Sequence, residues 1–227
     1  MNEARRECSS RVFGMRFPER QVYIRSEGRV HFHTFSPLAQ AKNLAGNDRL
    51  IAHLRLYPEA VTKGLATIAE TTHRFVEACL DTGIDGIFYA IQHAQASLLT
   101  LEEYKFFGLP YDLTSFSPAE KLWCNLLHLH GHDVDFSLLD SLEFQIVNWH
   151  DRETYPSLAE AQRLFSGVVC GGMRQNTLVY RDQAEVQKEA ADAIRQTNGK
   201  RFILGTGCVV PIIASHGNIS AARKSVE

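Results

Sequence analysis

The stretch Leu126-Leu127-His128-Leu129-His130-Gly131 decides how this sequence is interpreted, because it is a short apolar run that ends in two histidines. In a β-strand, residues i and i+2 point to the same face, so His128 and His130 would lie on one side together. A second apolar run, Phe202–Gly205, is followed closely by Cys208. If both runs are parallel strands of one barrel, the three side chains lie at the mouth where such barrels carry out chemistry.

Short apolar runs alternate with longer amphipathic stretches from residue 30 onward. Such alternation is typical of parallel βα units joined by right-handed crossovers. The predicted fold class is α/β, of the (β/α)8 TIM-barrel type. It is N-terminally incomplete, because the sequence contains about six predicted strands and a closed barrel has eight. An open doubly wound sheet is the alternative, but no G-x-G-x-x-G follows the first run. The six predicted strands are Val30–Phe35, Gly86–Ala90, Asn125–His130, Phe144–Trp149, Gly167–Cys170 and Phe202–Gly205.

Helical periodicity predicts three helices between and after these runs. Apolar residues recur at helical spacing from Pro58 to Leu80, with a proline suited to the first turn. A second helix is predicted from Glu185 to Arg195, ending before Asn198-Gly199. Asn218 is expected to cap the last helix.

The composition is that of an ordinary globular protein. The chain has 227 residues, 44% hydrophobic and 22% charged, with a net charge of −2. We therefore expect no nucleic-acid partner, and no apolar stretch is long enough to predict a membrane span. Five irregularly spaced cysteines favour reduced thiols and a cytoplasmic location. Seven arginines in the first 29 residues mark an arm, 1–29, ahead of one barrel domain, 30–227.

The residues His128, His130 and Cys208 are the candidate metal ligands. Two imidazoles and one thiolate are zinc ligands, and three protein ligands leave a fourth position open for a substrate. The alternative interpretation is a hydrogen-bonded pair of histidines and a small buried cysteine at a tight turn. His132 and His150 are spare candidates on loops. Both interpretations stay open from the sequence.

Polar residues that follow other predicted strands are candidates for binding a substrate, since binding residues gather on βα loops. They are Tyr89, Asn148 and His150. The alternative near Asn148 is a capping network in which Asp151 and Arg152 pair. Gly171-Gly172 would permit close backbone approach. No nucleophile elbow, Walker loop, H-E-x-x-H or C-x-x-C occurs, so the catalytic residues stay unknown.

The order and spacing of these pieces resemble the uroporphyrinogen decarboxylase superfamily over residues 30–227. The resemblance implies a (β/α)8 barrel that removes CO2 from the acetate arms of uroporphyrinogen in haem biosynthesis, without a cofactor. The tetrapyrrole is then the small-molecule substrate. The arginines and the aspartate that the family uses on this substrate have no counterpart in the sequence. The matching stretches are 34–38, 85–88, 103–104, 109–111, 127–131, 147–149, 171–172 and 205–211.

A sister branch, the corrinoid-linked methyltransferases, is more similar at the predicted barrel mouth. There a His-x-Cys pair and a late Gly-Cys hold zinc. This sequence has His130 where that branch has its first cysteine, so the resemblance implies His128, His130 and Cys208 as the zinc set. The zinc of that branch activates a thiol acceptor, and the methyl donor is carried by a corrinoid protein. An inactive fragment, or a remnant that only forms a homodimer, is the third possibility.

Overall fold

The computed structural model describes residues 13–17, 20–24 and 31–227, with side chains from His31 onward. Most of the predicted arm, 1–29, lies outside the described residues, as does Val30 at the start of the first predicted strand. Within the arm, β1 (Phe13–Phe17) and β2 (Arg20–Ile24) pair antiparallel. The division into an arm and a barrel domain stays a prediction.

Six strands alternate with helices along residues 31–227 and follow one another in sequence order in one sheet. The pairings β3–β4, β4–β5 and β7–β8 are parallel. The prediction of an α/β fold of the barrel type with about six strands is therefore confirmed, two strands short of a closed barrel within the described residues. The strands are β3 (His31–Phe35), β4 (Gly86–Ile91), β5 (Leu126–Leu129), β6 (Ile146–Trp149), β7 (Val168–Met173) and β8 (Phe202–Thr206).

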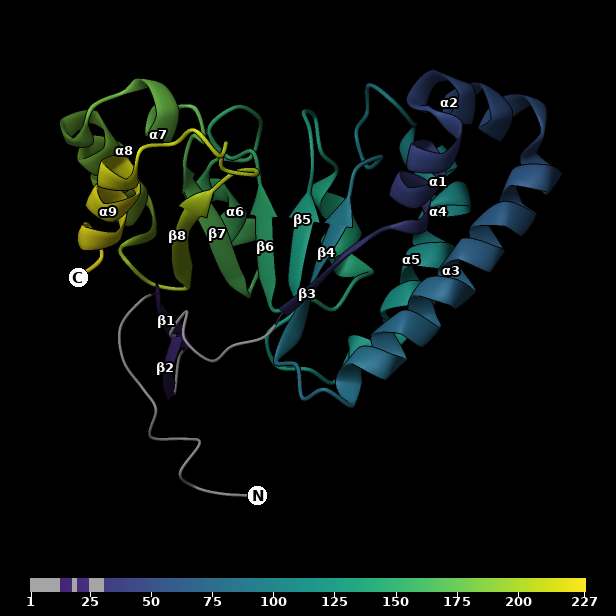
Figure 1. Ribbon diagram of the computed structural model, residues 1–227, viewed down its shortest axis with the longest axis horizontal. Coiled ribbons are helices and arrows are strands. Elements are labelled where there is room, and N and C mark those ends of the chain that lie inside the picture. The colour runs from purple at the N-terminus through teal and green to yellow at the C-terminus, as the bar shows by residue number, and fades with distance from the viewer. Residues whose placement is uncertain (1–12, 18–19, 25–30) are drawn as a thin grey trace. The chain divides into compact units, whose positions relative to one another are not determined.

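Residues 30–147 form the first of two compact units, in which helices cover one face of β3, β4 and β5 (Figure 1). Phe32 on that face meets Phe75 edge to face, with ring centroids 6.0 Å apart. The parallel register and the alternation of side chains then assign the two faces. The helix-covered face carries Phe32, Thr34, Ile87, Tyr89, Leu127 and Leu129, and the opposite face carries His33, Phe35, Phe88 and His128. The helices are α1 (Pro37–Ala45), α2 (Asn47–Leu56), α3 (Pro58–Leu80), α4 (Leu101–Phe107) and α5 (Leu109–Phe116), with short turns η2 (Ser117–Ala119) and η3 (Phe136–Asp140).

The longest helix, α3, has the bounds that the sequence predicts. Pro58 occupies its first turn, where a missing N–H costs nothing. Its buried residues recur every three or four positions, so one stripe faces the rest of the unit. These residues are Leu65, Ala69, Thr72, Val76 and Cys79.

Residues 148–227 belong to the second unit, in which β7 and β8 pair in parallel and helices surround them. Helix α8 extends the predicted helix by two residues at each end, and Asn198 ends it in the left-handed conformation at φ 51°. The guanidinium of Arg201 donates to the carbonyls of Phe165 and Gly167, just beyond the end of α6. The helices are α6 (Leu158–Leu164), α7 (Thr177–Tyr180), α8 (Gln183–Thr197) and α9 (His216–Lys224).

The predicted cap of the last helix is wrong. Helix α9 begins at His216, and the hydroxyl of Ser215 accepts the backbone N–H of Asn218 at 3.1 Å. Asn218 therefore lies inside the first turn. Its side-chain amide donates to the carbonyls of Leu178 and Arg181, at 3.0 and 2.7 Å, which ties α9 to α7.

Among the described residues, no helix is both long enough and apolar enough to cross a membrane. The cytoplasmic location stays a prediction.

Candidate metal-binding site

His128 and His130 lie next to each other at the end of β5, as the sequence predicts. His128 is buried on the face away from the helices, and the backbone N–H of His130 donates to the carbonyl of Ile91 at 2.9 Å. The strand pairing thus continues past Leu129, and the two rings point to one side, with centroids 5.6 Å apart. A nitrogen of each ring lies within 4.8 Å of one on the other. This spacing suits two ligands of one ion after a small movement.

The turn after this pair requires a glycine. Gly131 has φ +102°, and a Cβ there would lie 2.1 Å from the side-chain amide of Gln95. The oxygen of that amide accepts the backbone N–H of His132 at 3.2 Å. Gly131 and Gln95 therefore fix where the chain turns away after His130.

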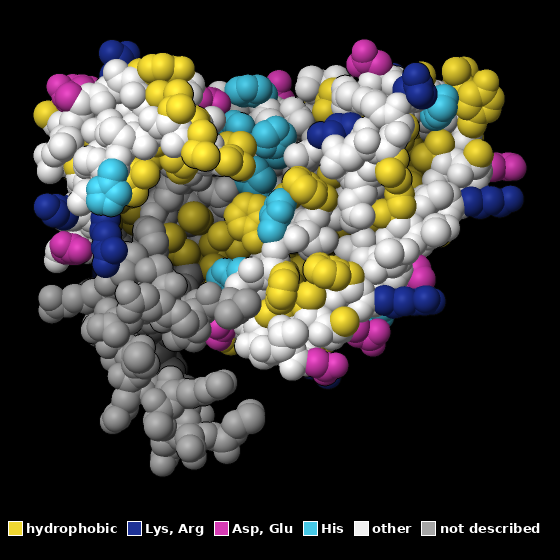
Figure 2. Space-filling view, in the orientation of Figure 1, with side chains coloured by type: hydrophobic (Ala, Val, Ile, Leu, Met, Phe, Trp, Pro, Cys, Tyr) yellow, Lys and Arg dark blue, Asp and Glu magenta, His cyan; other side chains and the backbone are white. Residues whose placement is uncertain are grey.

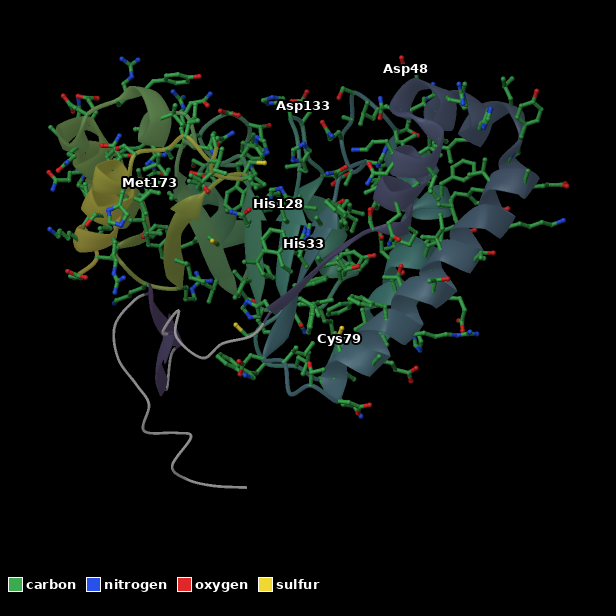
Figure 3. The ribbon with its side chains drawn as sticks, viewed as in Figure 1. His33, Asp48, Cys79, His128, Asp133 and Met173 are labelled. Atoms are coloured by element: carbon green, nitrogen blue, oxygen red, sulfur yellow. The ribbon has the colours of Figure 1, made fainter. Side chains whose placement is uncertain are left out.

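Aromatic rings continue from His128 across the same face of the sheet. The ring centroids of Phe88 and His128 are 5.6 Å apart, and those of His33 and Phe88 are 5.1 Å apart. Figure 3 labels His33 and His128 on this face, and Figure 2 shows histidine side chains next to hydrophobic ones near the middle of the view. Partial burial lowers the pKa of His33. A low pKa favours the neutral imidazole, the form that binds metals.

His150 and Cys208 form a second pair, within residues 148–227. A nitrogen of His150 and the Sγ of Cys208 lie within 4.8 Å of each other. Gly207 explains this approach, because a Cβ at its position would lie 2.9 Å from the Cα of His150 and the carbonyl of Trp149. A larger residue would push Cys208 away from His150.

The ring of His150 is held by a neighbouring carboxylate. Its Nδ1 lies 3.2 Å from Oε2 of Glu153, and His150 is buried while Glu153 is partly exposed. A carboxylate accepts, so Nδ1 carries the hydrogen and Nε2 carries the lone pair in the neutral ring. Metal-ligating histidines commonly have such a partner, which sets the tautomer and the ring orientation.

Residues 30–227 match the sequence profile of the family described as uroporphyrinogen decarboxylase (URO-D). The chain belongs to the URO-D family. No curated protein matches the chain. Among solved structures, a "methyltransferase from Methanosarcina mazei" is similar, with 15% sequence identity and a TM-score of 0.74. The match covers 89% of this chain and 59% of that one, so the chain spans about three-fifths of its length. This likeness shows a shared fold.

The three candidate substrate-binding residues of this URO-D family chain occupy different surroundings. His150 belongs to the pair with Cys208. Asn148 is buried, and its amide donates to the carbonyls of Cys170 and Thr206, at 2.9 and 3.0 Å. It thereby connects β6 with β7 and β8. A role of Asn148 in binding a substrate stays a prediction.

Tyr89 lies on the helix-covered face of β4, opposite to the face that carries His128. It is fully buried, and its hydroxyl donates to Oδ1 of Asp112 at 2.8 Å. Tyr104 donates to the other oxygen of the same carboxylate. Burial raises the pKa of Asp112 to about 7, against the two hydrogen bonds that lower it. The observed contacts of Tyr89 are thus those of a packed interior, and its predicted role in binding stays untested.

Two residues beside the second pair make contacts that the sequence does not predict. Glu153 holds His150, and Asp151 accepts the backbone N–H of Gly172. A carboxylate three residues after a strand-end histidine is the signal that points to Glu153. Cys170 on β7 is buried, and burial raises the pKa of its thiol to about 12, so Cys208 is the more accessible of these two thiols.

Proposed function

We propose that the chain is a zinc-dependent methyltransferase of the URO-D family, with His128, His130 and Cys208 as zinc ligands. The proposal rests on two close pairs of possible ligands. His128 and His130 lie at the end of β5, and His150 after β6 lies close to Cys208 after β8. Carboxyl ends of parallel strands meet at one edge of a sheet, where barrel enzymes place their sites. The proposed zinc set takes its ligands from both pairs.

The donor types fit zinc. Neutral imidazole nitrogen and thiolate sulfur are its usual ligands, and this set contains no hard oxygen ligand that would favour magnesium or calcium. His150, with its lone pair on Nε2, is a fourth candidate ligand that a substrate thiol would replace or join. When bound, zinc would lower the pKa of a thiol substrate and supply a thiolate near neutral pH.

The chain's own residues then hold and orient the reacting groups. Glu153 fixes the tautomer of His150, and Gly207 lets Cys208 approach it. We propose that the thiol substrate gives its proton to solvent. Its sulfur attacks the methyl carbon of a methylated corrinoid, forming a C–S bond. The Co–C bond breaks, and both of its electrons remain on cobalt. A corrinoid protein is the proposed partner and methyl donor.

The test is zinc content followed by methyl transfer. The purified protein should hold about one zinc per chain, and His130→Ala and Cys208→Ser should each lose most of it. His216→Ala is the matched control, because His216 is exposed on α9 and outside the set. With methylcobalamin and 2-mercaptoethanol, the wild-type protein should speed loss of the Co–C absorption. A wild-type protein without zinc, or variants that retain it, would overturn the ligand assignment.

Decarboxylation of uroporphyrinogen is the second candidate, and the family match favours it. We propose that this activity is absent or very weak in the present chain. The arginines and the aspartate that the resemblance associates with the substrate have no counterpart in the sequence, and charged groups of this kind supply much of a rate enhancement. Robust formation of coproporphyrinogen from uroporphyrinogen would make decarboxylation the first candidate function and methyl transfer the second. A protein with neither zinc nor activity would support an inactive remnant.

A further inference from the structure

A cavity of about 480 Å³ lies within residues 148–227, and its lining includes neither His150 nor Cys208. It is bounded by α7, α8 and the loops that follow β6 and β7. Four arginines and one lysine line it, together with three carboxylates. The cations therefore outnumber the acids, which gives the cavity a positive character.

The carboxylates on α8 neutralise only part of this charge. Asp192 binds Arg152 at 2.6 Å and Arg195 at 3.0 Å, so one carboxylate serves two guanidinium groups. Glu185 pairs with Lys188 at 3.7 Å. These contacts involve three of the five cations.

The remaining two cations, Arg174 and Arg181, form no ion pair in the part of the chain that the structure describes. Arg174 donates one Nη2 hydrogen bond to the carbonyl of Arg152, at 2.9 Å, and its backbone N–H donates to Glu189. The guanidinium of Arg181 makes no hydrogen bond to any described residue, and the residue is exposed. Thr177 also lines the cavity, and its hydroxyl likewise has no partner among the described residues.

We propose that this cavity binds the phosphate group of a small hydroxylated phosphate monoester. A phosphate dianion matches two arginines that lack acidic partners, and guanidinium forks bind phosphate oxygens through paired N–H groups. The hydroxyl of Thr177 supplies a further donor. Glu185 and Glu189 line the same space and would accept hydrogens from the hydroxyl groups of the ligand. The volume lies within the range of small-molecule sites.

This site is independent of the zinc proposal, since none of its arginines belongs to either ligand pair. A phosphorylated metabolite bound in this cavity, beside α7 and α8, would act as a substrate or an effector. Failure of one proposal therefore leaves the other intact.

Calorimetric titration with ribose 5-phosphate, inorganic phosphate and ribose tests the site. Ribose 5-phosphate should bind with a Kd below about 1 mM, inorganic phosphate should bind more weakly, and ribose should not bind. Arg181→Gln should raise the Kd about tenfold, as expected for loss of a charge-assisted hydrogen bond. Arg223→Gln is the matched control, because Arg223 is exposed on α9 and pairs with Glu227 at 3.5 Å.

Folding of the variants is checked by their melting temperatures. Arg181 is exposed, so Arg181→Gln should melt like the wild type, and Thr177→Val provides a second variant of the cavity lining. Binding of inorganic phosphate as tightly as ribose 5-phosphate would overturn the hydroxylated ligand. Absence of phosphate binding, or equal Kd values for wild type, Arg181→Gln and Thr177→Val, would overturn the site.

Discussion

Asp151 directs both of its carboxylate oxygens at the backbone N–H of Gly172, at distances of 3.0 and 3.1 Å. A Cβ on Gly171 would lie 2.4 Å from one of these oxygens, so the Gly-Gly pair makes room for the carboxylate. The Nε of Arg152 lies 3.7 Å from Oδ2 of Asp151, and its positive charge lowers the pKa of that carboxyl. Burial nevertheless dominates, and it raises the pKa of Asp151 to about 6. The close backbone approach that the sequence predicts at Gly171-Gly172 thus admits a carboxylate of the same chain.

Asp151→Asn should remove a pH dependence of stability. The carboxyl titrates near 6 when folded and near its ordinary value of 3.8 when unfolded, so the folded chain binds the extra proton between these values. Its contribution to the free energy of unfolding is therefore largest below pH 3.8, and it falls as the pH rises through 6. The loss is on the order of 3 kcal/mol. Urea unfolding of both proteins at several pH values measures the difference, with exposed Asp140→Asn as control. Parallel wild-type and Asp151→Asn curves would contradict the prediction.

Tyr89→Phe should destabilise the first unit. It removes one of the two phenolic donors to buried Asp112, and an unmet buried acceptor costs about 1–3 kcal/mol. Tyr180→Phe, at an exposed tyrosine on α7, should change the free energy of unfolding by less than about 0.5 kcal/mol. Chemical unfolding checks both. If Tyr89→Phe leaves stability intact but weakens substrate binding, the predicted substrate role of Tyr89 gains support.

His93 should make the protein sensitive to acid. It is fully buried, and neither ring nitrogen has a partner among the described residues. Burial, and next the charge of Lys42, lower its pKa to about 4 from 6.5. The unfolded chain therefore takes up a proton that the folded chain resists. The free energy of unfolding should fall as the pH drops from 6.5 to 4, on the order of 3 kcal/mol.

His93→Leu should abolish this part of the acid sensitivity and preserve or raise stability at pH 7.5, since it removes two unmet polar atoms. His216→Leu on exposed α9 is the control. Urea unfolding between pH 4 and 7.5 separates the variants. A His93→Leu curve as steep as that of the wild type would assign the sensitivity to other groups.

Two glycines should respond in opposite directions to alanine. At Gly86, where β4 begins, a Cβ would lie 1.9 Å from the carbonyl oxygen of Cys124, so the strands must separate. At Gly64, within α3, nothing lies within 4 Å of the added carbon. Gly86→Ala should cost about 3 kcal/mol or more, whereas Gly64→Ala should stabilise by about 0.5–1 kcal/mol. Thermal unfolding of the two variants decides this, and a Gly86→Ala protein as stable as the wild type would contradict the close approach of Cys124 to β4.

The sequence predicts the six strands and α3 well, because local periodicity and proline position determine them. The cap predicted at Asn218 is wrong because Ser215, three residues earlier, competes for the same role, and only the fold shows that Asn218 reaches Leu178. The His128–His130 pair follows from strand alternation alone. By contrast, the contacts of Tyr89 and Asp151 depend on residues distant in sequence or on a bend in the loop, and no local pattern encodes them.

Glu153 provides the most direct test of whether His150 binds the metal. If His150 is a ligand, loss of the carboxylate that holds its Nδ1 should weaken zinc binding about 10- to 100-fold. Glu153→Ala should show this loss, and Glu153→Gln, which can still accept a hydrogen bond, should fall between it and the wild type. Glu143→Ala, at an exposed glutamate outside the pair, is the control. Competition with a chromophoric chelator gives the affinities, and the visible spectrum of the cobalt-substituted protein reports the ligand set. Unchanged affinity and spectrum in Glu153→Ala would remove His150 from the ligand set and leave His128, His130 and Cys208 as the proposed ligands.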